Sequence, residues 1–222
     1  MSTRSFVIGD VHGCAHTLHH LLFKVLQVRR PDRVYLLGDL IDRGPRSKEV
    51  LDTLMRLRSA GYFIRSVRGN HEEMLLNACR DRDSFRLWML NGGAQTLASF
   101  NVEDACEIPF LYRNFIADLP YYLEHDRFVL VHAGINWNAA DPYADHEAML
   151  WSRGQPAYDK RTDRRRVICG HTSLPLAEIR DSLDTDCITL DGGCVYSQNP
   201  AWGKLVALEL GTMTLYDVSY CD

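Results

Sequence analysis

Short apolar runs recur along the chain, and each one stops at a glycine-containing turn. Their length of four or five residues and their content of β-branched and aromatic side chains are typical of β-strands. The five runs cover residues 5–8, 33–37, 63–67, 127–131 and 166–169. The turns after these runs carry Asp, Asn or His side chains, namely Asp10, His12, Asp39, Asn70, His132 and His171. The pattern therefore predicts five strands, each followed by a polar side chain that can bind a ligand.

Two stretches with helical periodicity lie between the first three of these runs. Apolar residues recur with a 3.6-residue period over 18–28 and again over 47–57, where Pro45 and Ser47 give an N-terminal signal. The alternation of strand, polar turn and helix predicts the α/β class. Because sites in such folds lie beyond the carboxyl ends of the strands, the five polar turns are expected to converge on one rim.

Two segments break this alternation. Residues 72 to about 115 predict a helical insertion beside the rim, with helices over 72–78 and 84–90 and a stop at Asn91-Gly92-Gly93. The tail, from residue 187 onward, contains strand-like runs separated by turns, with no helix long enough for a crossover. These runs predict an antiparallel sheet packed against the first. The expected fold is one α/β domain over residues 1–222 with two stacked sheets.

Composition narrows the class of protein. With 222 residues, 46% of them hydrophobic, the chain can bury a core, and its net charge of −4 gives no cationic field for nucleic acid. The basic cluster 161–166 is interpreted as a solvated loop rather than a binding patch. No run approaches the roughly 18 apolar residues of a membrane span. The seven cysteines are scattered, and the N-terminus enters a strand at once without room for a signal peptide, so a reduced, cytoplasmic protein is expected.

The convergent side chains point to metal chemistry. They offer carboxylate, amide and imidazole groups without thiolates, a set that suits manganese, iron or zinc. Six such residues exceed one tetrahedral site and suit two divalent ions that share a carboxylate. Asn70 would supply a neutral oxygen to one metal, whereas His71 would point away and donate a proton. Asp42 would hold the His71 imidazole, and Arg43 would direct its guanidinium at a phosphoryl group.

Other interpretations of single motifs are weaker. A lone Gly-Asp or Gly-His turn is usually only a turn, but five strand ends with ligand-type residues argue against that interpretation. Ser99, Ser173 and Cys14 could be nucleophiles, yet no His/Asp partner lies at a characteristic spacing. Gly9 and Gly13 belong to neither GxGxxG nor GxxxxGK[ST], so a nucleotide-binding loop is not indicated.

Five motifs, in this order and spacing, resemble those of the phosphoprotein phosphatase superfamily of metallophosphoesterases. They are GDVHG (9–13), GDLIDRGP (38–45), RGNHE (68–72), VHAGI (131–135) and CGHT (169–172). The stretches WMLNGGAQT (88–96), LPYYLE (119–124) and LWSRG (150–154) are similar to the short bacterial and bacteriophage serine/threonine phosphatases. The resemblance covers residues 6–196, nearly the whole chain.

The resemblance implies a four-layer sandwich, with helices around two central mixed β-sheets, and a role for each matching residue. The first metal would be held by Asp10, His12 and Asp39, and the second by Asp39, Asn70, His132 and His171. Asp39 would bridge the two ions, with manganese the first expectation and iron or zinc alternatives. His71 would be the general acid, supported by Asp42, while Arg43, Asn70 and Arg153 would bind the substrate phosphate. A metal-bridging hydroxide would attack phosphorus in line, without a phosphoenzyme.

Two substrate classes share these motifs. The chain's length favours a serine/threonine protein phosphatase over the longer symmetrical dinucleoside tetraphosphate (Ap4A) hydrolases. The absence of a long C-terminal extension leads us to expect no regulatory subunit, and no nucleic-acid or membrane partner is expected. A catalytically silent binding module would have lost a ligand residue, and none of the six is missing.

Overall fold

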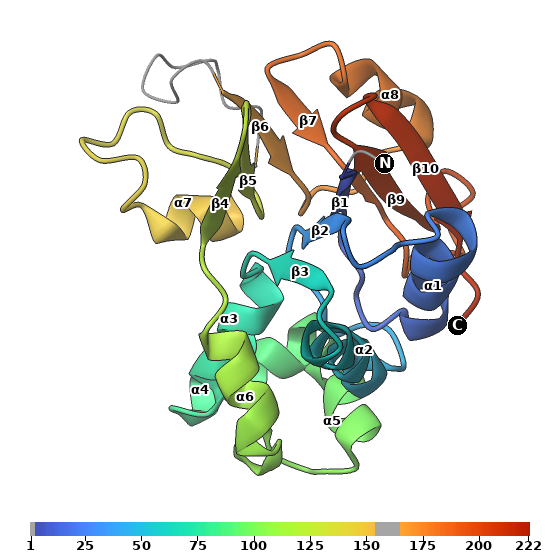
Figure 1. Cartoon of the computed structure of the whole chain (residues 1–222). Coiled ribbons are helices and arrows are strands. Elements are labelled where there is room, and N and C mark those ends of the chain that lie inside the picture. Colours follow the sequence, from blue (N-terminus) through green and yellow to red (C-terminus); the bar gives the residue numbers. More distant parts are fainter. Residues whose placement is uncertain (1–2, 154–164) are drawn as a thin grey trace.

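The computed structural model describes residues 3–153 and 165–222, which form two β-sheets with helices on their outer faces (Figure 1). The first sheet has the order β10-β9-β1-β2-β3, and β8 pairs with β9. Its strands are β1 (Ser5–Ile8), β2 (Arg33–Leu36), β3 (Phe63–Ser66), β8 (Asp191–Gly192), β9 (Lys204–Glu209) and β10 (Thr214–Ser219). The strands β1, β2 and β3 are parallel, whereas β9 runs antiparallel to β1 and β10.

The second sheet has the order β4-β5-β6-β7. Its strands are β4 (Tyr122–His125), β5 (Phe128–Val131), β6 (Arg166–Cys169) and β7 (Cys187–Thr189). The pairs β5–β6 and β6–β7 are parallel, and β4 is antiparallel to β5. Both sheets are therefore mixed, which confirms the predicted α/β class.

Alternating side chains on the strands build the layers. In β1, Val7 joins the core between the two sheets, whereas Phe6 and Ile8 face the core shared with the helices. In β5, Leu130 joins the core between the sheets, and Val129 faces the opposite way. Each fully buried side chain of this size contributes about 1.5–3 kcal/mol relative to exposure. The period-two pattern thus buries both faces of inner strands such as β1 and β5, whereas the edge strand β3 keeps Phe63 and Arg65 exposed.

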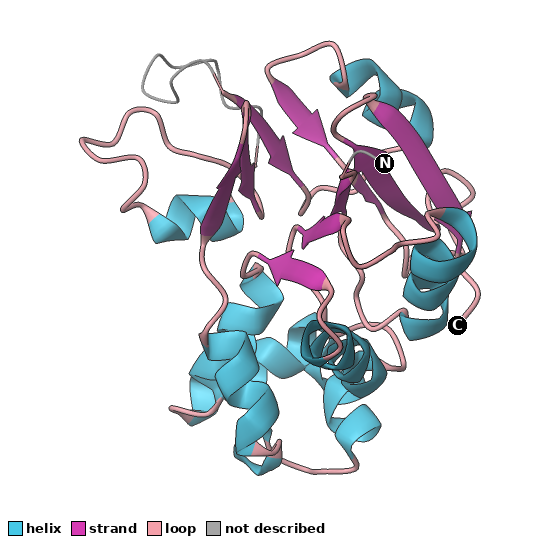
Figure 2. Ribbon diagram, in the orientation of Figure 1, coloured by secondary structure: helices cyan, strands magenta, loops and turns pink. Residues whose placement is uncertain are grey.

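Helices cover the outer faces of the sheets (Figure 2). They are α1 (Ala15–His20), α2 (Ser47–Ser59), α3 (Asn70–Ala78), α4 (Arg82–Trp88), α5 (Ala94–Phe100), α6 (Phe110–Ala117) and α7 (His146–Trp151). Helix α8 (Leu176–Ser182) instead packs its buried Ile179 into the core between the sheets. A π-helical turn (Leu21–Val25) extends α1, so the predicted helix over 18–28 begins earlier and ends earlier. The helix predicted over 47–57 is confirmed as α2.

The predicted helical insertion corresponds to α3 through α6, which gather on one side of β3 (Figure 1). The predicted stop at residues 91–93 is instead a kink, because a π-helical turn (Met89–Gly93) connects α4 to α5. A short 3-10 helix (Ala105–Glu107) precedes α6. Across residues 3–153 and 165–222, no helix is both long and apolar enough to cross a bilayer.

The predicted strands of the tail and the antiparallel pairing of β9 with β10 are confirmed, but their assignment to a separate sheet is wrong. Strands β9 and β10 extend the first sheet, whereas β7 joins β6 in the second sheet. The alternation in β9 explains its place, since Val206 and Leu208 enter the core between the sheets while Leu205 and Ala207 face the helices. A strand with two apolar faces fits inside a layered sheet, whereas the prediction had assigned it to a separate one.

Candidate metal centre

The polar turns come from both sheets. Strands β1, β2 and β3 lead into the turns that carry Asp10, Asp39 and Asn70, while β5 and β6 of the second sheet lead into His132 and His171. The stacking of the two sheets brings these turns together. The expected convergence on one rim therefore occurs, although two sheets supply it rather than one.

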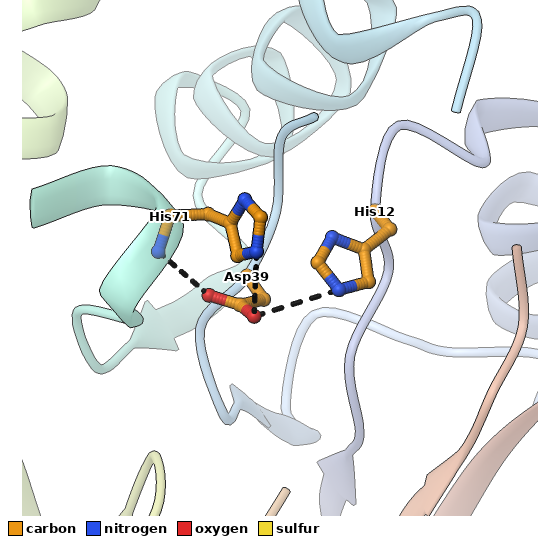
Figure 3. Close-up of side chains that lie close together, drawn as sticks. All are labelled: His12, Asp39 and His71. Atoms are coloured by element: carbon orange, nitrogen blue, oxygen red, sulfur yellow. Dashed lines mark hydrogen bonds and ion pairs between the residues drawn. The ribbon is translucent and has the colours of Figure 1, made fainter. Parts of the chain in front are cut away.

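Asp39 lies at the centre of the cluster (Figure 3). Its Oδ2 is 3.5 Å from Nε2 of His12 and 3.9 Å from Nε2 of His71. Figure 3 shows the carboxylate between these two rings. On the other side, its Oδ1 is 3.5 Å from Nε2 of His132. One carboxylate therefore faces imidazoles on both sides, which is the arrangement that a bridging ligand requires.

Within residues 3–153 and 165–222, two groups of side chains have the spacing of metal ligands. One is His12, Asp39 and His71, and the other is Asp39, His132 and His171, with ligand atoms within 4.8 Å of one another in each group. Asn70 Oδ1 joins the second group, at 2.8 Å from His132 Nε2 and 3.0 Å from His171 Nδ1.

Backbone carbonyls orient two of these imidazoles. His12 Nδ1 lies 3.0 Å from the carbonyl oxygen of Ile41, and His132 Nδ1 lies 2.8 Å from that of Leu37. An N–H must donate in each contact, so Nε2 is the ring nitrogen that each imidazole turns toward the cluster. Such hydrogen bonds fix the tautomer of metal-binding histidines.

Asp10 lies beside these groups, in contact with the backbone of His171. Its Oδ2 accepts the backbone N–H of His171 at 3.0 Å, but its buried Oδ1 has no hydrogen-bond partner among the described residues. A Cβ on Gly170 would lie 2.0 Å from this Oδ1, so only glycine fits there. An unpaired buried polar atom costs about 1–3 kcal/mol, which a bound cation would offset. The residues present thus fit a metal pair.

The surroundings of these side chains shift their pKa values, which affects how they can bind cations. Burial lowers the pKa of His12 and lowers that of His171 to about 4, so both imidazoles are neutral near pH 7. Burial alone would raise the pKa of Asp39, but the neighbouring imidazoles, His132 first, outweigh it and lower the pKa. Burial and the charges of Asp191 and Asp39 raise the pKa of Asp10.

Backbone strain concentrates at the same place. Outside glycine, left-handed φ values occur at five of the candidate site residues. They are His12 (46°), Asp39 (46°), Asp42 (70°), Arg43 (68°) and His171 (66°). This conformation costs of order 1–3 kcal/mol at a non-glycine residue and persists where the surroundings impose it. The fold therefore maintains strained turns to aim these side chains.

His71 forms a buried pair with Asp42. The distance between His71 Nδ1 and Asp42 Oδ2 is 2.8 Å, and both side chains are fully buried. Burial alone would lower the pKa of His71, but the charge of Asp39 and the hydrogen bond to Asp42 outweigh it and raise the pKa. Its Nε2 has no hydrogen-bond partner among the described residues, so this atom can donate a proton to another molecule or bind a metal.

The sequence analysis missed two side chains that hold Asp42. The indole Nε1 of Trp88 donates to Asp42 Oδ2 at 2.8 Å, and the hydroxyl of Thr96 donates to Asp42 Oδ1 at 2.6 Å. Both come from the helical insertion and lie in the quoted stretch 88–96. That stretch contributed only to the resemblance, because nothing in the local sequence connects it to Asp42.

Glu72 was also missed. Its carboxylate accepts the backbone N–H groups of Asp39, Leu40 and Gly69, each at 2.8 Å, so it ties the turns after β2 and β3 together. Burial and the charge of Asp39 raise its pKa to about 7, while these hydrogen bonds oppose the rise. The sequence had placed Glu72 as the first residue of a helix and as the last residue of the motif RGNHE, without a role.

The two arginines differ in position. Arg43 Nη1 lies 2.6 Å from His12 Nε2, and its guanidinium lies over the Tyr196 ring at 5.6 Å. Because one lone pair cannot serve an N–H and a metal together, cation binding requires this guanidinium to move away from His12. Arg153 follows α7, is exposed, and is close enough to His171 for its charge to contribute to the lowered pKa of that imidazole.

Together, the layered fold and the His/Asp groups define a metallophosphoesterase. The calcineurin-like phosphoesterase profile matches residues 3–206, and the chain belongs to this family. The matched residues include His/Asp groups of the kind typical of the family's dinuclear metal site. The resemblance to the phosphoprotein phosphatases is confirmed.

Relatives carry two different names. A symmetrical bis(5'-nucleosyl)-tetraphosphatase of Vibrio parahaemolyticus is 34% identical over 132 residues, 60% of this chain and 45% of that protein. Serine/threonine-protein phosphatase 1 of Salmonella typhimurium is 34% identical over 157 residues, 67% of this chain and 68% of the relative. A crystal structure provisionally named a diadenosine tetraphosphatase has a TM-score of 0.68 at 21% identity, covering 100% of this chain and 96% of its own. The chain thus spans about half the length of the first relative.

Replacing Trp88 with phenylalanine tests the support of the His71–Asp42 pair. Trp88→Phe should lower kcat on a phosphoserine peptide about tenfold, because a hydrogen bond to a charged group is worth about 1.5–3 kcal/mol and Thr96 still holds Asp42. Bound metal, measured by elemental analysis, should be unchanged. Trp137→Phe, a partly buried tryptophan packed beside the second sheet, is the matched control. Metal loss in Trp88→Phe, or an equal defect in both variants, would contradict this role.

Proposed function

We propose that the chain is a serine/threonine protein phosphatase that hydrolyses phosphomonoesters with two divalent metal ions, manganese first and iron or zinc as alternatives. The observation that carries the proposal is the buried His71–Asp42 pair beside the two His/Asp groups. A seryl or threonyl alkoxide is a poor leaving group and needs a proton. An imidazole with a raised pKa and an open Nε2 is suited to deliver it.

Each part of the site has its own task. Asp10, His12 and Asp39 would hold one metal, and Asp39, Asn70, His132 and His171 would hold the other. When bound, the metal pair lowers the pKa of water and neutralises charge on the phosphoryl oxygens.

The remaining polar groups act on the substrate. Arg43, Arg153 and the amide of Asn70 bind the phosphoryl oxygens, which holds the ester in place. His71 then donates the proton on Nε2 to the leaving oxygen. Asp42, which accepts from Nδ1, stabilises the charged imidazole before the transfer and keeps Nε2 aimed at the substrate.

The proposal also covers the cellular compartment and the partners of the enzyme. We treat residues 1–222 as one metallophosphoesterase domain that works in the cytoplasm on phosphorylated proteins, without a regulatory subunit, nucleic acid or membrane. The second candidate is a symmetrical Ap4A hydrolase. The relative from Vibrio parahaemolyticus, which carries that name at 34% identity, favours it.

A substrate panel on manganese-reconstituted protein separates the two candidates. Phosphoserine, phosphothreonine and phosphotyrosine peptides should be compared with diadenosine tetraphosphate by kcat/KM. The phosphoserine and phosphothreonine peptides should exceed diadenosine tetraphosphate by at least about tenfold, within the 10–200-fold range that modest pocket contacts provide. A higher kcat/KM for diadenosine tetraphosphate would replace the protein phosphatase with the hydrolase.

A further inference from the structure

A hollow of about 400 Å³ begins at Arg43, beside the metal centre. Its other walls come from two segments far apart in the sequence. They are Leu90, Asn91, Gly92 and Gln95 of the helical insertion and Val195 and Tyr196 of the loop after β8. The volume lies within the range of pockets that bind small molecules or side chains.

Arg43 connects this hollow to the reacting phosphoryl group. Its backbone N–H donates to the carbonyl oxygen of Gly92 at 3.1 Å, while its guanidinium lies over Tyr196 and reaches His12. Gly92 has a φ of 103°, and a Cβ there would lie 2.9 Å from Arg43 N. The wall of the hollow and the backbone of the phosphate-binding arginine are therefore one packed unit. With the phosphoryl group on Arg43 as proposed, a group attached to a phosphoryl oxygen on this side lies next to the hollow.

The lining favours a neutral occupant with apolar surface. Among the described residues of the lining, Arg43 is the one cation and none is acidic. The substrate phosphate would bind Arg43, so no free charge remains in the lining. Leu90, which lines the hollow, is 85% exposed, and Tyr196, which also lines it, is half-buried. The side-chain amide of Asn91 donates to Leu87 O at 2.8 Å, which leaves its oxygen to accept a peptide N–H.

Charge argues against a tetraphosphate in the same place. A dinucleoside tetraphosphate carries several negative charges, and each anionic group needs a cation or N–H donors in a partly dehydrated site. The described lining offers one guanidinium for that purpose. A phosphopeptide brings one dianionic phosphate, and a neutral side chain next to it matches the composition of the hollow.

We propose that this hollow is a subsite for the residue directly before or after the phosphorylated serine or threonine, and that it selects an apolar or aromatic side chain. The inference rests on the proposed protein phosphatase activity. Leu90 and Tyr196 are then specificity-determining residues, and the exposed leucine becomes covered when the substrate binds.

The test uses phosphoserine peptides that differ at one neighbouring position. Peptides with Phe, Ala or Asp directly before the phosphoserine, and a second set with the same residues directly after it, are compared by kcat/KM on the manganese-reconstituted protein. At one of the two positions, Phe should exceed Ala about tenfold, and the difference should lie mainly in KM.

Two leucines of one helical segment supply the variants. Leu90→Ala should reduce the Phe/Ala ratio to about twofold or less, whereas Leu87→Ala should leave the ratio unchanged, because Leu87 is 53% exposed but does not line the hollow. The ratio is taken within each variant, so a general change in activity cancels.

The failure of the subsite and the failure of the proposed function give different results. Equal kcat/KM for all peptides, or a ratio that Leu90→Ala leaves intact, would overturn the subsite while the protein phosphatase stands. Hydrolysis of diadenosine tetraphosphate without hydrolysis of any peptide would overturn both. If Leu90→Ala weakens only the dinucleotide reaction, the hollow receives a nucleobase and the inference is wrong.

Discussion

Asp39→Asn is expected to lose metal from both sites and to lower the hydrolysis of phosphoesters by about 10³-fold or more. Asp39 faces His12 and His71 through Oδ2 and His132 through Oδ1, so loss of its charge weakens both groups of ligands. Metal ions contribute several kcal/mol of charge stabilisation to such reactions, and each 1.36 kcal/mol is a factor of ten in rate.

Asparagine is the appropriate replacement at this position. The φ of 46° at residue 39 lies in the left-handed region, which Asn tolerates. The Oδ1 of Asn can still accept the backbone N–H of His71, a contact of 3.1 Å from Asp39 Oδ1. The substitution therefore removes the negative charge and leaves the shape of the turn.

Asp10→Asn is the matched comparison, since Asp10 belongs to only one proposed site. Both proteins should be reconstituted with manganese, checked for folding by circular dichroism and analysed for bound metal. Asp39→Asn should retain less metal than Asp10→Asn. Equal loss in both variants, or greater loss in Asp10→Asn, would remove Asp39 from the bridging position.

His71→Asn is expected to lower kcat on a phosphoserine peptide by about 10²–10⁴-fold while bound metal stays nearly intact. The proposed task of His71 is to donate a proton to the leaving oxygen. A seryl alkoxide needs that proton, whereas p-nitrophenolate, with its low pKa, leaves with little help. The defect on p-nitrophenyl phosphate should therefore be smaller.

The structure is also compatible with a second role for His71, that of a metal ligand. Its Nε2 is 3.9 Å from Asp39 Oδ2, and it groups with His12 and Asp39 at the spacing of metal ligands. If His71 binds a metal, His71→Asn should lose metal and impair both substrates equally. Asp42→Asn provides an independent check. It should show a milder form of the leaving-group dependence, because Asp42 orients the imidazole and favours its charged form.

The sequence was informative where local patterns decide the structure. Four- and five-residue apolar runs predicted β1, β2, β3, β5 and β6, and helical periodicity predicted α2 nearly to its ends. The candidate ligands were found because each follows one of these strands. Strand ends are a property of the local sequence, and the layered fold brings them together.

Pairing between distant strands was not accessible in the same way. The alternation in 204–210 predicts a strand but does not specify its neighbour in the sheet. In the structure β9 pairs with β1, which lies near the other end of the chain. The support of Asp42 was hidden for a related reason. Trp88 and Thr96 lie 46 and 54 positions from Asp42, and only the packing of the insertion against the turn after β2 joins them.

The dependence of hydrolysis on bound metal tests the central claim most directly. The protein should be stripped with a chelator, verified as metal-free by elemental analysis, and titrated with manganese while p-nitrophenyl phosphate hydrolysis is followed. We expect negligible hydrolysis by the stripped protein and recovery that saturates at two equivalents of bound manganese. Undiminished hydrolysis by verified metal-free protein would contradict the account.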